Sequence, residues 1–177
     1  MTYSLLQLSD NECQIYNETI QRDTNVGAVD TSDEWLFKNY KDIHNQYLNI
    51  FENSDSEDVK MEALKRMIFL NWYSVVEPQY LTGITDLEEK SMYKSYSLLN
   101  DYIELQKLDI EFDWMLKHYS SWKHLILYFS GKNLLALTSF VNSVDTSNLK
   151  LPQNNLPKEI MDNRGQMGIY WKSIIWR

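Results

Sequence analysis

Apolar residues recur three or four positions apart through most of this chain, which is the spacing of a helix with one buried face. The clearest stretch runs from Ser32 to Phe51, where Leu36, Tyr40, Ile43 and Tyr47 fall on one side. We therefore predict a long amphipathic helix there. Polar residues from 22 to 30, with a glycine among them, predict a loop before it.

Two capping-box sequences predict where further helices begin, because a serine and a glutamate three residues later satisfy the free amides of a first turn. The first, Ser9-Asp-Asn-Glu12, predicts a short helix over about 10–21. The second, Ser54-Asp-Ser-Glu57, predicts a long helix that ends near Glu77. Pro78 sets that end, because proline disfavours helical geometry in the residue before it.

The same reasoning predicts three more helical segments. A third long helix starts in Thr85–Glu88, after a loop, and a fourth runs from Asp109 to a C-cap at Gly131. A short apolar helix follows over about 133–143. The stretch 145–157 holds two of the three prolines, so we expect it to be irregular.

The C-terminal tail, 164–177, is rich in large apolar side chains that would be costly to leave in water. We expect it to dock on the body of the protein. The predicted fold is thus all-α, one domain over 1–177, with four long helices and two or three short ones. The side chains that favour docking are Trp171, Ile174, Ile175 and Trp176.

The amino-acid composition also favours a helical fold, and the sequence indicates a cellular location. The chain has only 5 glycines and 3 prolines, against about 12 and about 9 at average usage, so the turns of a many-stranded β fold are scarce. Cys13 is the single cysteine, which excludes an intrachain disulfide. The N-terminal sequence lacks a signal-peptide pattern and no apolar run is long enough for a membrane span, so we expect a cytoplasmic protein.

Charge is divided unevenly along the chain, whose net charge is −8. Residues 1–60 carry 12 acidic and 4 basic side chains, whereas 114–177 carry 3 and 8. The two parts fold against each other, or the acidic part is a docking surface for a basic partner. The carboxylates of Glu52, Asp55, Glu57 and Asp58 are the candidate surface; the alternative is a solvated helix start.

The residues typical of catalysis or cofactor binding do not form recognised patterns. His44, His118 and His124 lack the spacing of a zinc or di-iron site. The acids at 109, 111 and 113 lack the glycine of a calcium loop, and no phosphate-binding loop or nucleophile elbow occurs. We therefore expect no metal, no cofactor and no catalytic residue. The basic side chains near the C-terminus are too dispersed for a nucleic-acid site.

Two segments combine aromatic side chains with a charged residue at a break in the backbone. Glu77 lies at an apolar helix end, where a buried carboxylate needs a cation, and Arg164 is the natural partner. We expect a buried pair that locks the tail to the body. The alternative is a ligand pocket formed by the same residues with three aromatic ones: Trp72, Tyr170 and Trp171.

These segments read LNWYSVVEPQYLTGI over 70–84 and RGQMGIYWKSI over 164–174. They resemble segments of small, mostly helical bacterial proteins of uncharacterised function. The resemblance implies a helical bacterial protein and brings no activity, cofactor or catalytic residue with it.

Three functions fit these features. The leading hypothesis is a non-catalytic protein-binding domain, in particular an immunity- or antitoxin-type inhibitor of a basic toxin, because the chain is small, acidic and rich in Trp and Tyr. The second is an enzyme or small-molecule binder that uses the aromatic pocket around Glu77 and Arg164. The third is a structural protein that self-associates through its tail. The sequence leaves the partner and the oligomeric state open.

Overall fold

Helices are the regular secondary structure of the described residues, which confirms the predicted all-α class. The computed structural model describes residues 3–24, 37–130, 133–149 and 156–176. The helices are α1 (Leu5–Thr24), α2 (Tyr40–Asn53), α3 (Glu57–Val76), α4 (Gln79–Thr82), α5 (Glu89–Glu104), α6 (Ile110–Tyr119), α7 (Lys123–Ser130), α8 (Leu135–Ser143) and α9 (Gly165–Ile175). The 3-10 turns are η1 (Ser120–Trp122), η3 (Thr146–Asn148) and η4 (Lys158–Met161).

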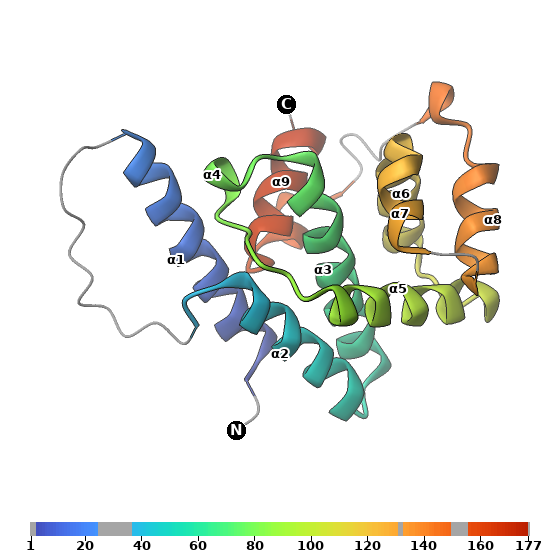
Figure 1. Cartoon of the computed structure of the whole chain (residues 1–177), viewed down its shortest axis with the longest axis horizontal. Coiled ribbons are helices and arrows are strands. Elements are labelled where there is room, and N and C mark those ends of the chain that lie inside the picture. The colour runs from blue at the N-terminus through green and yellow to red at the C-terminus, as the bar shows by residue number, and fades with distance from the viewer. Residues whose placement is uncertain (1–2, 25–36, 131–132, 150–155, 177) are drawn as a thin grey trace.

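Helix α3 runs through the middle of the fold (Figure 1). On one side α2 packs along α3 and α1 packs on α2, while α6, α7 and α8 lie on the other side. Helix α5 crosses at the base of this layer and packs on α3, α7 and α8. Helix α9 packs on both α1 and α3, so the C-terminal helix closes the core that the first helices begin.

One continuous hydrophobic core joins these helices, and aromatic rings fill much of it. The tail contributes directly, because Trp171 is fully buried and Ile175 is 3% exposed. The prediction that the tail docks on the body is therefore confirmed. The largest fully buried side chains are Trp72, Trp171, Tyr40, Tyr47, Tyr96, Tyr119, Phe69 and Phe112.

The predicted start of the first helix was wrong. Helix α1 begins at Leu5, and its capping box is Ser4-Leu-Leu-Gln7: the Gln7 amide donates to Ser4 Oγ at 3.2 Å, and the Ser4 amide donates to Gln7 Oε1 at 2.9 Å. Ser9 lies inside the helix, with its hydroxyl 2.6 Å from the Asn163 carbonyl. Its tertiary contact, not capping, explains the serine.

Helix α1 thus begins earlier than predicted, whereas α2 and α3 begin later, although the helices themselves are confirmed. Helix α2 begins at Tyr40, because the Asn39 side chain accepts from the amide of Asp42 and caps the first turn. Residues 32–36 of the predicted helix lie outside the described residues. Helix α3 is capped by Ser56 rather than Ser54, and it ends immediately before Glu77 and Pro78 as predicted.

The predicted fourth long helix is divided into α6 and α7 by the 3-10 turn η1. At this turn the Ser120 hydroxyl donates to the Leu116 carbonyl at 2.7 Å, a contact that competes with regular helix geometry. The short helix α4 lies in the loop expected before α5, and α5 begins at Glu89. The predicted C-cap, Gly131, and residues 150–155 of the expected irregular stretch lie outside the described residues.

Candidate functional site

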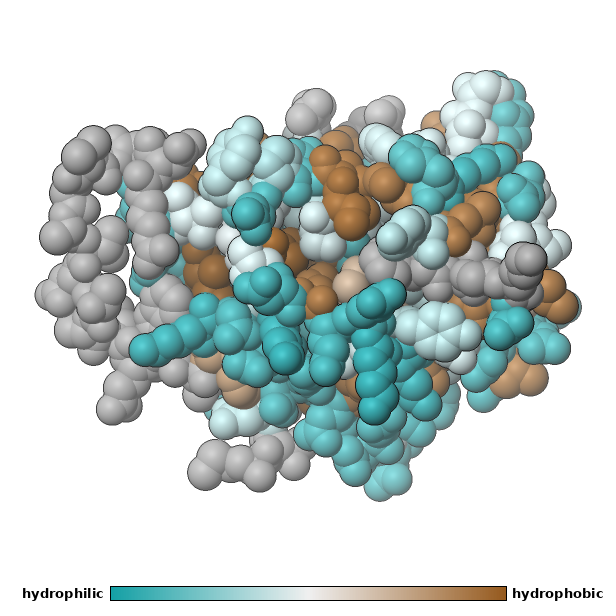
Figure 2. Space-filling view, in the orientation of Figure 1, coloured by the Kyte–Doolittle hydropathy of each residue, from teal (hydrophilic) through white to brown (hydrophobic). Residues whose placement is uncertain are grey.

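The four carboxylates of the predicted docking surface all lie exposed where α2 ends and α3 begins. We call them the acidic turn: Glu52, Asp55, Glu57 and Asp58. Hydrophilic side chains gather over this end of the two helices in Figure 2. Among the described residues, Glu57 is the one of the four that has partners: its carboxylate accepts from the Tyr102 hydroxyl at 3.2 Å and from Lys60 at 3.4 Å. The hydrogen bond from Tyr102 is the main cause that lowers the pKa of Glu57.

An apolar depression of about 430 Å³ lies next to the acidic turn. We call it the N-terminal hollow. Leu6 is 51% exposed at its edge, although leucine is normally buried. Asn53 and Ser54 line the hollow and lie in the chain between acidic-turn residues, so an apolar recess and a row of carboxylates share one surface. The hollow is lined by Tyr3, Ser4, Leu5, Leu6, Ile50, Asn53, Ser54 and Val59.

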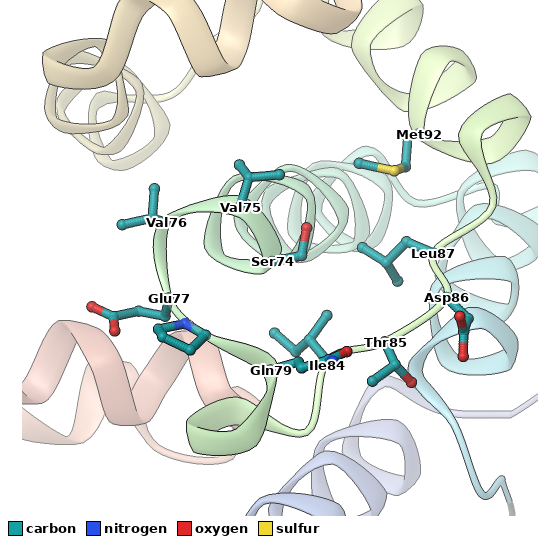
Figure 3. A pocket seen from close by; sticks show the side chains of 11 residues that line it. Ser74, Val75, Val76, Glu77, Gln79, Ile84, Thr85, Asp86, Leu87 and Met92 are labelled. Carbon is teal, nitrogen blue, oxygen red and sulfur yellow. The ribbon is translucent and has the colours of Figure 1, made fainter.

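A second depression, of about 560 Å³, lies between the end of α3 and the start of α5 (Figure 3). We call it the α3–α5 pocket. Its lining includes Glu77 and Asp86, and hydrophobic side chains gather near this end of α3 in Figure 2. The backbone shapes it: Pro78 ends α3, and Asp86 has a left-handed backbone with φ +55°. The lining residues are Ser74, Val75, Val76, Glu77, Pro78, Gln79, Ile84, Thr85, Asp86, Leu87 and Met92.

The predicted pairing of Arg164 with Glu77 was wrong, because Arg164 binds two other carboxylates. Its Nε donates to Glu62 Oε1 at 2.8 Å, and its Nη1 and Nη2 donate to the two oxygens of Glu111 at 2.7 and 2.9 Å. Nη2 also pairs with Glu62 Oε2. The arginine does tie the tail to the body, but through α3 and α6. Glu77 lies in the α3–α5 pocket, which Arg164 does not line.

The charges around Arg164 continue into a chain of ion pairs. Arg66 donates from Nε to Glu62 Oε1 at 2.8 Å, and Lys65 Nζ lies 2.5 Å from Glu111 and 2.6 Å from Asp109. Burial works against the charged forms, but the nearby arginine hydrogen bonds and charges prevail and lower the pKa of Glu62 and of Glu111. These carboxylates are already neutralised within the chain, so they are poor candidates for binding a partner.

Sequence reasoning missed Glu12, which was interpreted as part of a capping box. Glu12 is 1% exposed and accepts from the Tyr47 hydroxyl at 2.5 Å and from the Gln166 amide at 2.9 Å. It therefore caps the first turn of α9 from another helix. A side chain at Gly165, whose φ is +55°, would collide with this carboxylate. Burial raises the pKa of Glu12. Only the tertiary fold reveals this role.

The aromatic members of the predicted site form a packed cluster rather than an open pocket. Trp72 stacks on Tyr119 with ring centroids 4.6 Å apart, and Trp171 lies edge-on to His118 at 4.9 Å. The Tyr170 hydroxyl lies 2.7 Å from His118 Nε2. Burial lowers the pKa of His118 to about 4, which keeps the ring neutral near pH 7. The structure brings Trp72, Tyr170 and Trp171 together, with Tyr170 partly buried against the core, and these three side chains are not part of the lining of the α3–α5 pocket.

Another histidine, His44, is fully buried, and neither ring nitrogen makes a close hydrogen bond with the residues that the structure describes. Burial lowers the pKa of His44 from 6.5 to about 4, against a smaller opposing effect of Asn71. Below pH 6.5 His44 takes up a proton in the unfolded chain, whereas in the folded chain it stays neutral until the pH nears 4. His44 should therefore cost the protein up to about 3 kcal/mol of stability as the pH falls from 6.5 to 4.

Urea unfolding at a series of pH values tests this expectation. His44→Gln should flatten the decline of the unfolding free energy between pH 6.5 and 4, whereas His124→Gln, at an exposed position, should leave it unchanged. An equal slope in the wild type and in His44→Gln would contradict the assignment.

No three side chains of His, Cys, Asp or Glu converge as a metal site within the described ranges. None of the described helices is both long and apolar enough to cross a bilayer. Comparison with family models, with curated proteins and with solved structures gives no match for this chain.

Proposed function

We propose that this chain is a non-catalytic protein-binding domain that recognises a basic protein, with an immunity- or antitoxin-type inhibitor of a basic toxin as its leading form. The observation that carries the proposal is the position of the acidic turn directly beside the N-terminal hollow. Protein interfaces gain most of their affinity from apolar anchors in recesses, and charges around the recess guide the encounter.

The chemistry of this surface favours a basic partner over an acidic one. Glu52, Asp55 and Asp58 are exposed, and no ion pair neutralises them in the described part of the chain. An apolar side chain of the partner would enter the hollow beside Leu6, and lysine or arginine side chains around it would meet the carboxylates. The net charge of −8 adds long-range attraction for such a partner.

A capture experiment with matched variants tests the proposal. The tagged protein is used to capture partners from a lysate of its source organism at about 50 mM salt, where exposed charges are weakly screened. The triple variant E52K/D55K/D58K and the single variant Leu6→Asp should each reduce the captured partner at least tenfold. The control, E89K/D101K/E104K, changes net charge equally at exposed positions on α5 and should retain the partner.

Two outcomes would refute the proposal: equal loss of the partner in the test and control triple variants, or retention in all of them. The inhibitor form makes a further demand. The captured partner, expressed alone, should arrest growth of the host, and co-expression of the wild-type chain should restore it while E52K/D55K/D58K does not.

A further inference from the structure

The α3–α5 pocket differs from the acidic turn in having carboxylates at its two ends and a mixed lining between them. Glu77 and Asp86 lie at opposite ends of the labelled side chains in Figure 3, and both apolar and polar side chains lie between them: Val75, Ile84, Leu87, Ser74, Gln79 and Thr85. Ile84 is 2% exposed and Met92 is 5% exposed, so the middle of the pocket is a wall of the core rather than a mobile surface.

Both carboxylates lack a cation in the described part of the chain. No ion pair of Glu77 or Asp86 is recorded there, and the described side chains that line the pocket include no lysine, arginine or histidine. This contrasts with Glu62 and Glu111, which arginine and lysine neutralise. Glu77 is also half-buried, and its charge assists burial in raising the pKa of the neighbouring Tyr73 to about 12.

Local sequence fixes the positions of these two carboxylates. Glu77 is the C-cap of α3, held in an extended conformation before Pro78. Asp86 adopts φ +55° in the segment that leads into α5, a conformation that aspartate tolerates better than most residues. The backbone positions of the two carboxylates are thus set where α3 ends and where the chain leads into α5.

We propose that the α3–α5 pocket binds a linear organic dication, a diamine or polyamine, with one ammonium at each carboxylate and its methylene chain over the apolar side chains of Val75 and Leu87. Alkylamines are protonated near pH 7, as lysine is. Methylene groups gain about 0.8 kcal/mol each when they leave water, which favours a hydrocarbon spacer over a polar one. The volume of about 560 Å³ lies in the range of small-molecule sites. This site is independent of the proposed protein-binding surface.

Isothermal titration of the full chain at about 50 mM salt tests the proposal with three five-carbon probes: 1,5-diaminopentane, n-pentylamine and 1,5-pentanediol. The diamine should bind at least tenfold more tightly than the monoamine, and the diol should not bind. Glu77→Gln and Asp86→Asn should each weaken diamine binding about tenfold, to the level of the monoamine. Glu89→Gln, which removes an equal charge at an exposed site outside the pocket, should leave binding unchanged.

Amide shifts in a nitrogen-15 NMR titration should move in residues 74–92 and not around the acidic turn. Equal affinity for monoamine and diamine, no saturable diamine binding, or equal weakening by Glu89→Gln would overturn the proposal. A peptide with two lysines around an apolar residue provides a further test. If this peptide binds, and Glu77→Gln and Asp86→Asn weaken its binding, while the free diamine does not bind, then the proposal is also overturned, because the site would belong to a protein ligand.

Discussion

Replacing Trp171 by alanine is expected to lower the free energy of unfolding by about 3–5 kcal/mol, the usual cost of deleting a large aromatic side chain from a closed core. Trp171 is fully buried on α9, packs edge-on against Trp114 at 4.6 Å, and donates from Nε1 to the Tyr119 hydroxyl at 3.1 Å. The substitution opens a cavity and removes the indole N–H that donates to the buried Tyr119 hydroxyl. Urea unfolding followed by circular dichroism measures the loss.

Trp176 gives a matched control, because it lies on the same tail and is only partly buried. Trp176→Ala should cost clearly less than Trp171→Ala. If Trp171→Ala costs less than about 1 kcal/mol, then the docking of α9 contributes little to stability. If the two substitutions cost the same, then the burial of Trp171 does not set the size of the loss. The total free energy of unfolding of a domain is roughly 5–15 kcal/mol, so the loss expected for Trp171→Ala is a large share of it.

The sequence predicted which segments are helical because each buried face repeats with the helical period, as Tyr40, Ile43 and Tyr47 do on α2. It predicted helix starts poorly, because several serines compete for the same role. Ser4, Ser9, Ser54 and Ser56 all precede apolar stripes, but Ser4 and Ser56 cap helices, whereas a serine inside a helix can make a tertiary contact instead. Ser9, for example, accepts a hydrogen bond from Arg66, far away in the sequence.

The candidate sites, too, could be predicted only in part. The exposed carboxylates of the acidic turn could be found from sequence because they are close together in the chain. The partners of Arg164 could not, because Glu62 lies 102 residues away and Glu111 lies 53 residues away. From charge alone, many acidic residues were equally good candidates for the partner of Arg164. The packing of α9 against α3 and beside α6 determined which two were in reach.

The positions of the acidic side chains separate those that are paired from those that can bind a partner. Arg66, Arg164 and Lys65 form ion pairs with carboxylates near the core, Glu62 and Glu111, where burial makes an unpaired charge costly. Glu52 and Glu77 have no ion pair in the described part of the chain; Glu52 lies at a helix end next to the N-terminal hollow, and Glu77 lines the α3–α5 pocket. Both proposals concern these remaining acids, at two separate places in the fold.

Arg164→Met should destabilise the protein by about 3–5 kcal/mol near pH 7, because breaking a buried pair leaves its partners uncompensated. Arg164 is 8% exposed and forms two-pronged contacts with both Glu62 and Glu111. Arg164→Lys keeps the charge but loses the fork, so its cost should fall between those of the wild type and Arg164→Met. Urea unfolding of the three proteins measures these differences.

The pH dependence of this loss identifies its origin. In the wild type the lowered pKa values of Glu62 and Glu111 supply stability that is present above pH 4.5, their unfolded value, and lost as the pH falls through the lower folded values. Without Arg164 less of this stability exists. The difference between wild type and Arg164→Met should therefore be largest near neutral pH and shrink below pH 4.5, where the carboxylates take up protons. A pH-independent difference would mean that Arg164 acts through packing of its side chain and not through its charge.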